Sequence, residues 1–187
     1  MLFVLTGSAG SGKSTALREL AARRDDLAVF DFDDLRPPPN ASQSWWQRQI
    51  DQQVARAVAE QARGRDTVLA GWLSADEVLA APAAAGLEGL ALCLLDCADE
   101  VRLARIESRA ASGTWRLHTP AEVAGFLGAA ARMRQSATGL FRLDTSTLNA
   151  AAVASTLENW MAHARPDRRS QSQPAPTSPR HGWRQVR

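Results

Sequence analysis

The feature that most constrains this chain is the run Gly7-Ser8-Ala9-Gly10-Ser11-Gly12-Lys13-Ser14 near its start. The run fits the pattern G-x-x-x-x-G-K-[ST], in which backbone N–H groups surround phosphate oxygens and the lysine reaches the outer phosphates. Before it, residues 1–6 form a short apolar run typical of a buried strand, and after it residues 14–24 have helical periodicity. The sequence therefore predicts a strand, a phosphate-binding loop and a helix in succession.

The lysine of this loop is the only lysine in the chain, beside 21 arginines. A planar guanidinium group cannot imitate a compact ammonium group at a phosphate, so the single lysine favours a real phosphate site. We expect Lys13 to reach the β- and γ-phosphates of a nucleotide and the Ser14 hydroxyl to bind Mg²⁺. The predicted nucleotide contacts are Gly7, Ser8, Ala9, Gly10, Ser11, Gly12, Lys13, Ser14 and Thr15.

Length and charge narrow the class of protein. A chain of 187 residues predicts one domain with a substantial core. The net charge of +2 is unevenly distributed, because residues 165–187 carry +5 and residues 1–164 carry −3. The negative charge of residues 1–164 does not favour a broad nucleic-acid-binding surface.

No apolar run approaches the ~20 residues that cross a bilayer, and the first strand leaves no room for a signal peptide, so we expect a cytoplasmic protein. Cys93 and Cys97 are expected to be buried thiols.

Strand and helix patterns alternate along residues 1–162. Further strands are predicted at residues 27–32, 67–72, 90–96 and 140–144, with helices between and after them. This alternation predicts an α/β fold with a five-stranded parallel sheet and helices on both faces, and ligands in such sheets bind beyond the carboxyl ends of the strands. Residues 163–187 are rich in Pro, Ser, Gln and Arg and are predicted to be a disordered basic tail.

Two further runs carry a family resemblance. The run Asp31-Phe32-Asp33-Asp34-Leu35-Arg36 begins at the end of the second predicted strand. Residues 95–109 begin at the end of the fourth and carry arginines at positions 102, 105 and 109. Together with the phosphate-binding loop, these runs resemble the P-loop kinases of small metabolites. That branch includes shikimate kinase, gluconate kinase, chloramphenicol phosphotransferase and the 5′-hydroxyl polynucleotide kinases. The resemblance covers residues 1 to about 162.

The resemblance implies roles for the residues of these runs. Asp33 matches the carboxylate that accepts the proton of the attacking hydroxyl, Asp31 matches a carboxylate near the metal, and Arg36 matches an acceptor-binding arginine. Arg105 and Arg109 match the pair that a mobile lid closes on the transferring phosphoryl group. Arg102 and Arg116 either join this pair or belong to an exposed arginine-rich surface.

The chain departs from the family at the end of the third strand. Many relatives place there an Asp that supports Mg²⁺, whereas this chain reads Ala70-Gly71-Trp72. Asp31 is the first candidate to replace that carboxylate, and Asp96 is the second. Gly71 either lets backbone approach the acceptor or serves packing. Trp46 continues an apolar helical stripe and is expected in the core, whereas Trp45 projects away from the stripe as a possible wall of the acceptor pocket.

The remaining predicted positions are a site for the adenine and a loop histidine. The resemblance places Asp144-Thr145-Ser146 near the adenine, and His118 is expected to be a solvent-exposed loop histidine. The implied activity is transfer of the γ-phosphoryl group of ATP, with Mg²⁺, to a hydroxyl of a small molecule. Two alternatives remain open: a 5′-hydroxyl nucleic-acid kinase and a slow ATPase module that switches a partner. The sequence does not predict the acceptor, the choice between ATP and GTP or the oligomeric state.

The predicted tail generates a first test. Because residues after 165 lack an apolar face, a protein that ends at Arg165 should keep its melting temperature and its turnover nearly unchanged. Differential scanning calorimetry and an ADP-release assay on both lengths measure these quantities. A large loss of either quantity would contradict the prediction and favour the nucleic-acid alternative.

Overall fold

The computed structural model describes residues 1–35, 37–113 and 118–165. Its five strands form one parallel sheet in the order β2-β3-β1-β4-β5, which confirms the predicted α/β fold. The strands are β1 (Leu2–Thr6), β2 (Leu27–Asp31), β3 (Asp66–Gly71), β4 (Leu90–Asp96) and β5 (Phe141–Asp144). Since β1 is the central strand, the loop that follows it emerges in the middle of the carboxyl edge of the sheet.

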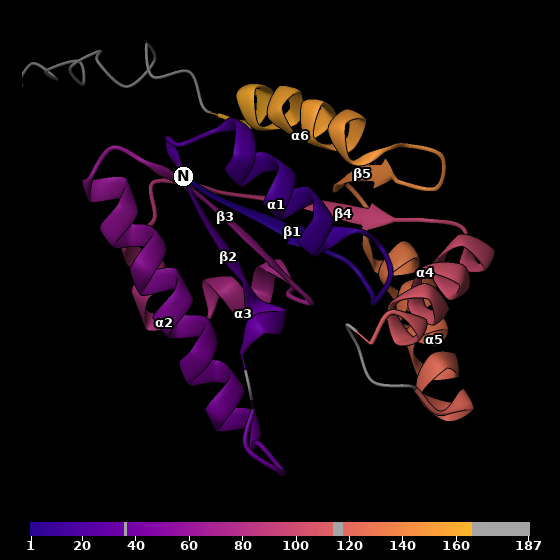
Figure 1. The fold of residues 1–187 in the computed structure, drawn as a ribbon. Helices are drawn as coiled ribbons and strands as arrows, with labels where there is room; N and C mark the ends of the chain where they lie inside the picture. Colours follow the sequence, from indigo (N-terminus) through magenta and orange to yellow (C-terminus); the bar gives the residue numbers. More distant parts are fainter. Residues whose placement is uncertain (36, 114–117, 166–187) are drawn as a thin grey trace, which may run out of the picture.

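Helices cover both faces of the sheet (Figure 1). They are α1 (Lys13–Arg23), α2 (Gln43–Ala62), α3 (Ala75–Leu79), α4 (Asp99–Ala111), α5 (Pro120–Ser136) and α6 (Ala150–Ala164), with short 3₁₀ helices at Phe32–Asp34 and Pro82–Gly86. Helices α1 and α6 lie on one face, and α2 and α3 lie on the other. Helices α4 and α5 lie together near the carboxyl end of β4.

The alternation of side chains along β1 builds a core on each face of the sheet. Phe3 and Leu5 pack into the cluster that contains α1 and α6, whereas Leu2 and Val4 pack into the cluster that contains α2 and α3. Side chains of successive strand residues point to opposite faces, so a strand covered on both faces must be apolar throughout. All five residues of β1 are buried accordingly.

Local capping explains where several helices begin. The Ser42 side chain accepts a hydrogen bond from the Trp45 N–H and starts α2. Ser74 with Glu77 and Thr119 with Glu122 form capping boxes at the starts of α3 and α5. Each cap satisfies backbone N–H groups that a helix leaves without an internal partner.

Some predictions fall on residues that the structure leaves undescribed. Arg36, Arg116 and residues 166–187 of the predicted tail lie outside the described residues. Over the described ranges, none of the helices combines the length and the apolar character needed to cross a bilayer.

The packing of the core predicts that two leucines contribute differently to the free energy of unfolding. Leu157 of α6 is fully buried in the cluster shared with α1, whereas Leu79 at the end of α3 is 60% exposed. Leu157→Ala should lower the free energy of unfolding by about 2–5 kcal/mol, because the cavity adds to the lost burial. Leu79→Ala should stay within about 0.5 kcal/mol. Urea denaturation of both variants measures the difference, and equal effects would contradict the described packing.

Candidate active site

The phosphate-binding loop connects β1 to α1 and requires glycine at its first position. A Cβ atom on Gly7 would lie 2.4 Å from the Leu95 carbonyl oxygen and 2.6 Å from Ser11 Oγ, so a side chain cannot fit. Helix α1 then begins with no side-chain cap and no acidic residue in its first turn. Its N–H groups and the positive end of its dipole are therefore left for an anion.

The carbonyl groups of the loop all receive hydrogen bonds from outside the loop or from its lysine. Lys13 Nζ donates to the Gly7 and Ser8 oxygens at 2.9 and 3.4 Å. The next carbonyl oxygens accept from Arg102 at Ala9 (2.7 Å), from Arg105 and Cys97 at Gly10 (3.2 and 3.6 Å) and from Thr145 at Ser11 (3.0 Å). The carbonyls of Ala9, Gly10 and Ser11 are thus held by groups outside the loop. In a trans peptide the N–H points opposite to the C=O, so the N–H groups paired with these three carbonyls point away from the outside partners.

Asp33 and Lys13 meet at the mouth of this loop. Asp33 Oδ2 lies 3.5 Å from Lys13 Nζ, and the Asp33 side chain is 56% exposed whereas Lys13 is buried. Asp31 holds the turn that presents Asp33, because Asp31 Oδ1 accepts a hydrogen bond of 3.0 Å from the Asp33 N–H. The structure thus brings the predicted base beside the predicted phosphate-binding lysine.

Gly71 explains how Asp33 reaches that position. Strand β3 lies between β2 and β1, so the turn after β2 must cross the end of β3 to approach the loop. A Cβ atom on Gly71 would lie 2.7 Å from the Cβ atom of Phe32, the residue before Asp33. Gly71 therefore makes room for Phe32, which is the packing role that the sequence left open, and contact of its backbone with an acceptor stays a prediction.

The predicted acceptor side of the site is aromatic. Trp46 packs on Phe32, with ring centroids 5.9 Å apart, and belongs to the α2 side of the core as expected. Trp45 contacts Trp46 edge to face at 4.7 Å and is half-buried. The aromatic row from Phe32 to Trp45 thus begins beside Asp33, and contact of Trp45 with an acceptor stays a prediction.

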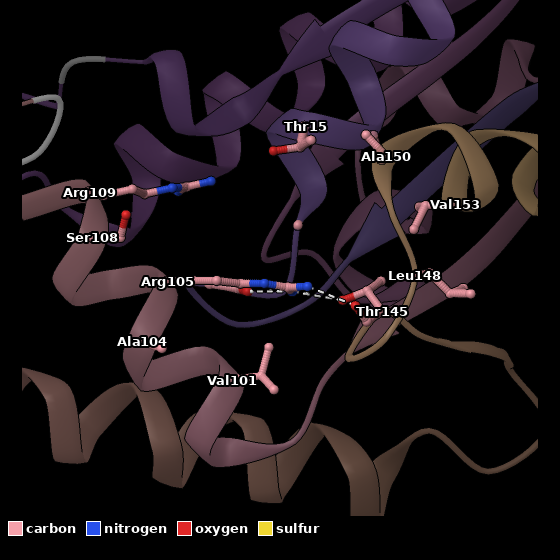
Figure 2. Close-up of a pocket in the computed structure, with 13 residues that line it drawn as sticks. Thr15, Val101, Ala104, Arg105, Ser108, Arg109, Thr145, Leu148, Ala150 and Val153 are labelled. Atoms are coloured by element: carbon pink, nitrogen blue, oxygen red, sulfur yellow. Dashed lines mark hydrogen bonds between the residues drawn. The ribbon is translucent and has the colours of Figure 1, made fainter. Parts of the chain in front are cut away.

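A cavity of about 530 Å³ lies between α4 and the loop that leads into α6 (Figure 2). Arg105 and Arg109 of α4 point into it, and Thr15 of α1 and Thr145 after β5 lie on its other side. Thr145, which was predicted to lie near the adenine, thus lines a cavity beside the phosphate-binding loop. Sequence reasoning missed the apolar wall of this cavity, because small and branched apolar residues carry no signal that separates a wall from a core. The wall consists of Val101, Ala104, Leu148, Ala150 and Val153.

The three arginines of α4 have different surroundings. Arg105 Nη1 donates to Gly10 O and Thr145 Oγ1, and its Nη2 donates to Thr145 O at 2.7 Å. The Arg105 guanidinium therefore clamps the loop to the segment after β5, and its role at a transferring phosphoryl group stays a prediction. Arg102 is fully buried behind the loop and belongs neither to a lid nor to an exposed surface. The Arg109 side chain lines the cavity, and its role in phosphoryl transfer stays a prediction.

Asp96 is unsuited to support a metal. Its carboxylate accepts hydrogen bonds from Arg102, Arg134 and Arg142 at 2.6, 2.7 and 3.5 Å, so its charge is already compensated. Arg134 also donates to Asp99, and this hydrogen bond holds the pKa of Asp99 below its ordinary value. Arg134 had no signal in the sequence, because its partners lie on β4 and α4, far from α5 along the chain.

The described residues fit Mg²⁺ only together with a nucleotide. Within ranges 1–35, 37–113 and 118–165, no group of three or more His, Cys, Asp or Glu residues could hold a metal ion. Ser14 lies in the first turn of α1, Asp31 is the last residue of β2, and Asp33 lies in the 3₁₀ helix that follows. This sparse set of oxygen donors suits Mg²⁺, which usually keeps several waters and takes ligands from phosphates.

His118 differs from its prediction as an exposed histidine. Its side chain is only 4% exposed and packs edge to face on Phe126 of α5, and its Nδ1 lies 3.7 Å from Glu122. The same Phe126 accepts a hydrogen bond of 2.8 Å from Ser8 Oγ through its backbone carbonyl. This hydrogen bond joins α5 to the phosphate-binding loop across 118 residues of sequence.

The fold and the loop define a P-loop nucleotide-binding protein, and comparison with known proteins supplies its family. The sequence profile of the AAA domain family matches residues 4–115, which is more than half of the chain. This chain therefore belongs to the AAA domain family. No curated protein matches it by sequence.

Solved structures share the fold. The chain is similar to a sugar kinase from Janibacter sp. HTCC2649, with a TM-score of 0.61, 15% identity and coverage of 86% of this chain and 94% of that chain. It is also similar to a tunicamycin resistance protein from Deinococcus radiodurans, with a TM-score of 0.60, 15% identity and coverage of 86% of this chain and 94% of that chain. A gluconokinase from Sinorhizobium meliloti 1021 has a TM-score of 0.54, 18% identity and coverage of 87% of this chain and 97% of that chain. These likenesses confirm the P-loop kinase fold that the sequence predicted.

The two cysteines generate a test of this site's packing. Burial raises the pKa of the Cys93 thiol to about 12 and also raises the pKa of Cys97, although Arg102 and Arg105 oppose the shift at Cys97. Both thiols should therefore react slowly with dithionitrobenzoate at about pH 8 and react at once in guanidinium chloride. Ala22→Cys, at an exposed position of α1, adds the fast-reacting control. Rapid reaction of both native thiols in the folded protein would contradict their burial.

Proposed function

We propose that this protein is an ATP- and Mg²⁺-dependent phosphotransferase that moves the γ-phosphoryl group to a hydroxyl of a small molecule. The observation that carries the proposal is the placement of Asp33, an exposed carboxylate 3.5 Å from Lys13 Nζ at the mouth of the loop. A general base must lie within reach of the proton that it accepts, and Lys13 marks the position of the outer phosphates. A loop that only binds a nucleotide does not require such a carboxylate.

In the proposed reaction, the chain positions reactants more than it takes part in bond changes. The loop N–H groups and Lys13 hold the β- and γ-phosphates. The acceptor hydroxyl oxygen bonds to the γ-phosphorus while the bond from phosphorus to the β–γ bridging oxygen breaks, and ADP leaves. Asp33 accepts the hydroxyl proton. Mg²⁺, held by Ser14 with support from Asp31, would neutralise charge on the phosphate oxygens when bound.

The cavity beside the loop supports adenine as the base. Its wall is apolar on the α6 side and carries the Arg105 guanidinium on the α4 side. Guanine presents adjacent N–H donors on its Watson–Crick edge, for which a carboxylate is a natural acceptor. The described residues that line the cavity include no Asp or Glu. ATP is therefore the proposed donor.

The similar structures support a small-molecule acceptor. Two of them are named as a sugar kinase and a gluconokinase. The charge of −3 on residues 1–164 weighs against a nucleic-acid strand as acceptor, because strand binding relies on cationic contacts with phosphates. The carboxylate beside Lys13 weighs against a switch module without an acceptor.

Asp33→Asn tests the proposed base. This variant should lose roughly 10² to 10⁴ of the phosphoryl-transfer rate while its ATP affinity changes little, because only proton acceptance is removed. Asp34→Asn, at the neighbouring exposed carboxylate, is the matched control and should keep most activity. Lys13→Ala should abolish nucleotide turnover and keep the fold, as measured by circular dichroism. The rate is measured as ADP release across a library of hydroxyl metabolites.

Two outcomes would reject the proposal. If no hydroxyl compound stimulates ADP release and Asp33→Asn leaves slow hydrolysis unchanged, the switch module is the better reading. If only 5′-hydroxyl oligonucleotides stimulate ADP release, the acceptor is a nucleic acid.

A further inference from the structure

A fully buried arginine supports the phosphate-binding loop from behind. The side chain of Arg102 in α4 is 0% exposed, its Nη1 donates to Ala9 O at 2.7 Å, and its Nη2 donates to Asp96 Oδ1 at 2.6 Å. Its buried Nε has no hydrogen-bond partner in the part of the chain that the structure describes. Burying a guanidinium group is costly, and an apolar residue of similar size is often as stable at such a site. Stability alone therefore gives a poor reason for arginine here.

Arg102 acts on the loop and does not contact the cavity. It is absent from the residues that line the cavity beside the loop, so it does not face a bound nucleotide. A Cβ atom on Gly10 would lie 3.0 Å from Arg102 Cγ, so Arg102 packs directly against the loop. Because the Ala9 carbonyl and the Gly10 N–H belong to one planar trans peptide, fixing Ala9 O also fixes the direction of the Gly10 N–H.

Asp96 fixes Arg102 in turn. Its side chain is 13% exposed, and Arg134 of α5 binds its Oδ2 at 2.7 Å while Arg102 binds its Oδ1. Asp99 lies 3.9 Å from Arg102 Nε and also binds Arg134. The third arginine at this carboxylate, Arg142, lies farther away at 3.5 Å and is half-exposed. A connected set of contacts thus runs from α5 through Asp96 and Arg102 to the loop.

We propose that Arg102 is a positioning residue that holds the Ala9–Gly10 peptide in the orientation that binds the β-phosphate, and that Asp96 and Arg134 set the position of Arg102. This inference rests on the nucleotide binding in the proposed function. Arg102 contributes to the affinity for a diphosphate without touching it. Its loss therefore affects ligands with a β-phosphate and spares ligands without one.

The experiment compares three ligands by isothermal titration calorimetry at a temperature where every variant is folded. ADP and inorganic pyrophosphate probe the β-phosphate site, and AMP probes the cavity without a β-phosphate. Arg102→Met keeps the side-chain length and removes the donors, and it should weaken ADP and pyrophosphate by about tenfold, as expected for loss of one charge-assisted hydrogen bond. Its affinity for AMP should stay within about twofold of the wild type. Arg142→Met is the matched control at the same carboxylate and should bind all three ligands like the wild type.

Two conservative variants extend the test. Arg102→Lys keeps the positive charge but loses the rigid fork of donors that holds Ala9 O and Asp96 together, so it should recover part of the ADP affinity lost in Arg102→Met. Asp96→Asn loosens Arg102 without removing it and should weaken ADP more than AMP. If Arg102→Met does not fold, these two variants carry the test with the same three ligands.

Failure of the proposed function and failure of this inference give different results in the experiment. Wild-type protein that binds neither ADP nor pyrophosphate would overturn the proposed function and this inference with it. Wild-type protein that binds ADP, combined with unchanged ADP affinity in the Arg102 and Asp96 variants, would overturn the inference alone. Equal losses for ADP and AMP would also overturn it, because they would indicate general disruption of the site.

Discussion

The orientation of the peptide groups in the phosphate-binding loop is the constraint on which the rest of the site depends. Each planar peptide can point either its carbonyl or its N–H toward a ligand, and only the second choice attracts phosphate. Lys13, Arg102, Arg105, Cys97 and Thr145 together hold the five successive carbonyls from Gly7 to Ser11. These donors come from α1, α4 and the segments after β4 and β5, so the sheet must be assembled before the loop is fully shaped.

The choice of cation follows from this arrangement. Arginine has several donors in a rigid plane, which suits Arg102 and Arg105 because each holds a loop carbonyl and a second partner at once. Lysine presents one compact charge, which suits the loop interior where Lys13 also meets Asp33. The chain thus separates the support of the loop, made with arginine, from the contact with phosphate, assigned to its single lysine.

The strand order sets the geometry of the proposed base. Because β3 separates β2 from β1, a carboxylate after β2 reaches the loop only if the end of β3 is small. Gly71 leaves that space, Phe32 fills it, and Asp33 is carried to 3.5 Å from Lys13. Glycine at the end of β3 and the position of Asp33 beside the loop are therefore two parts of the same packing.

Local signals in the sequence determined the strands, the capped helix starts and the phosphate-binding loop, because each depends on neighbours within a few residues. The alternation of strands and helices also placed Asp33 and the loop on one edge of the sheet, since the carboxyl ends of parallel strands share one edge, and the family resemblance predicted Asp33 near the phosphates. Only the tertiary structure decided the roles of Arg102, Arg105, Asp96, Gly71 and His118. Their partners are distant in sequence, as with Ala9 and Arg102, which are 93 residues apart. The physical reason is that a side chain's function depends on which donor, acceptor or ring the fold places against it, and periodicity records only the face on which it lies.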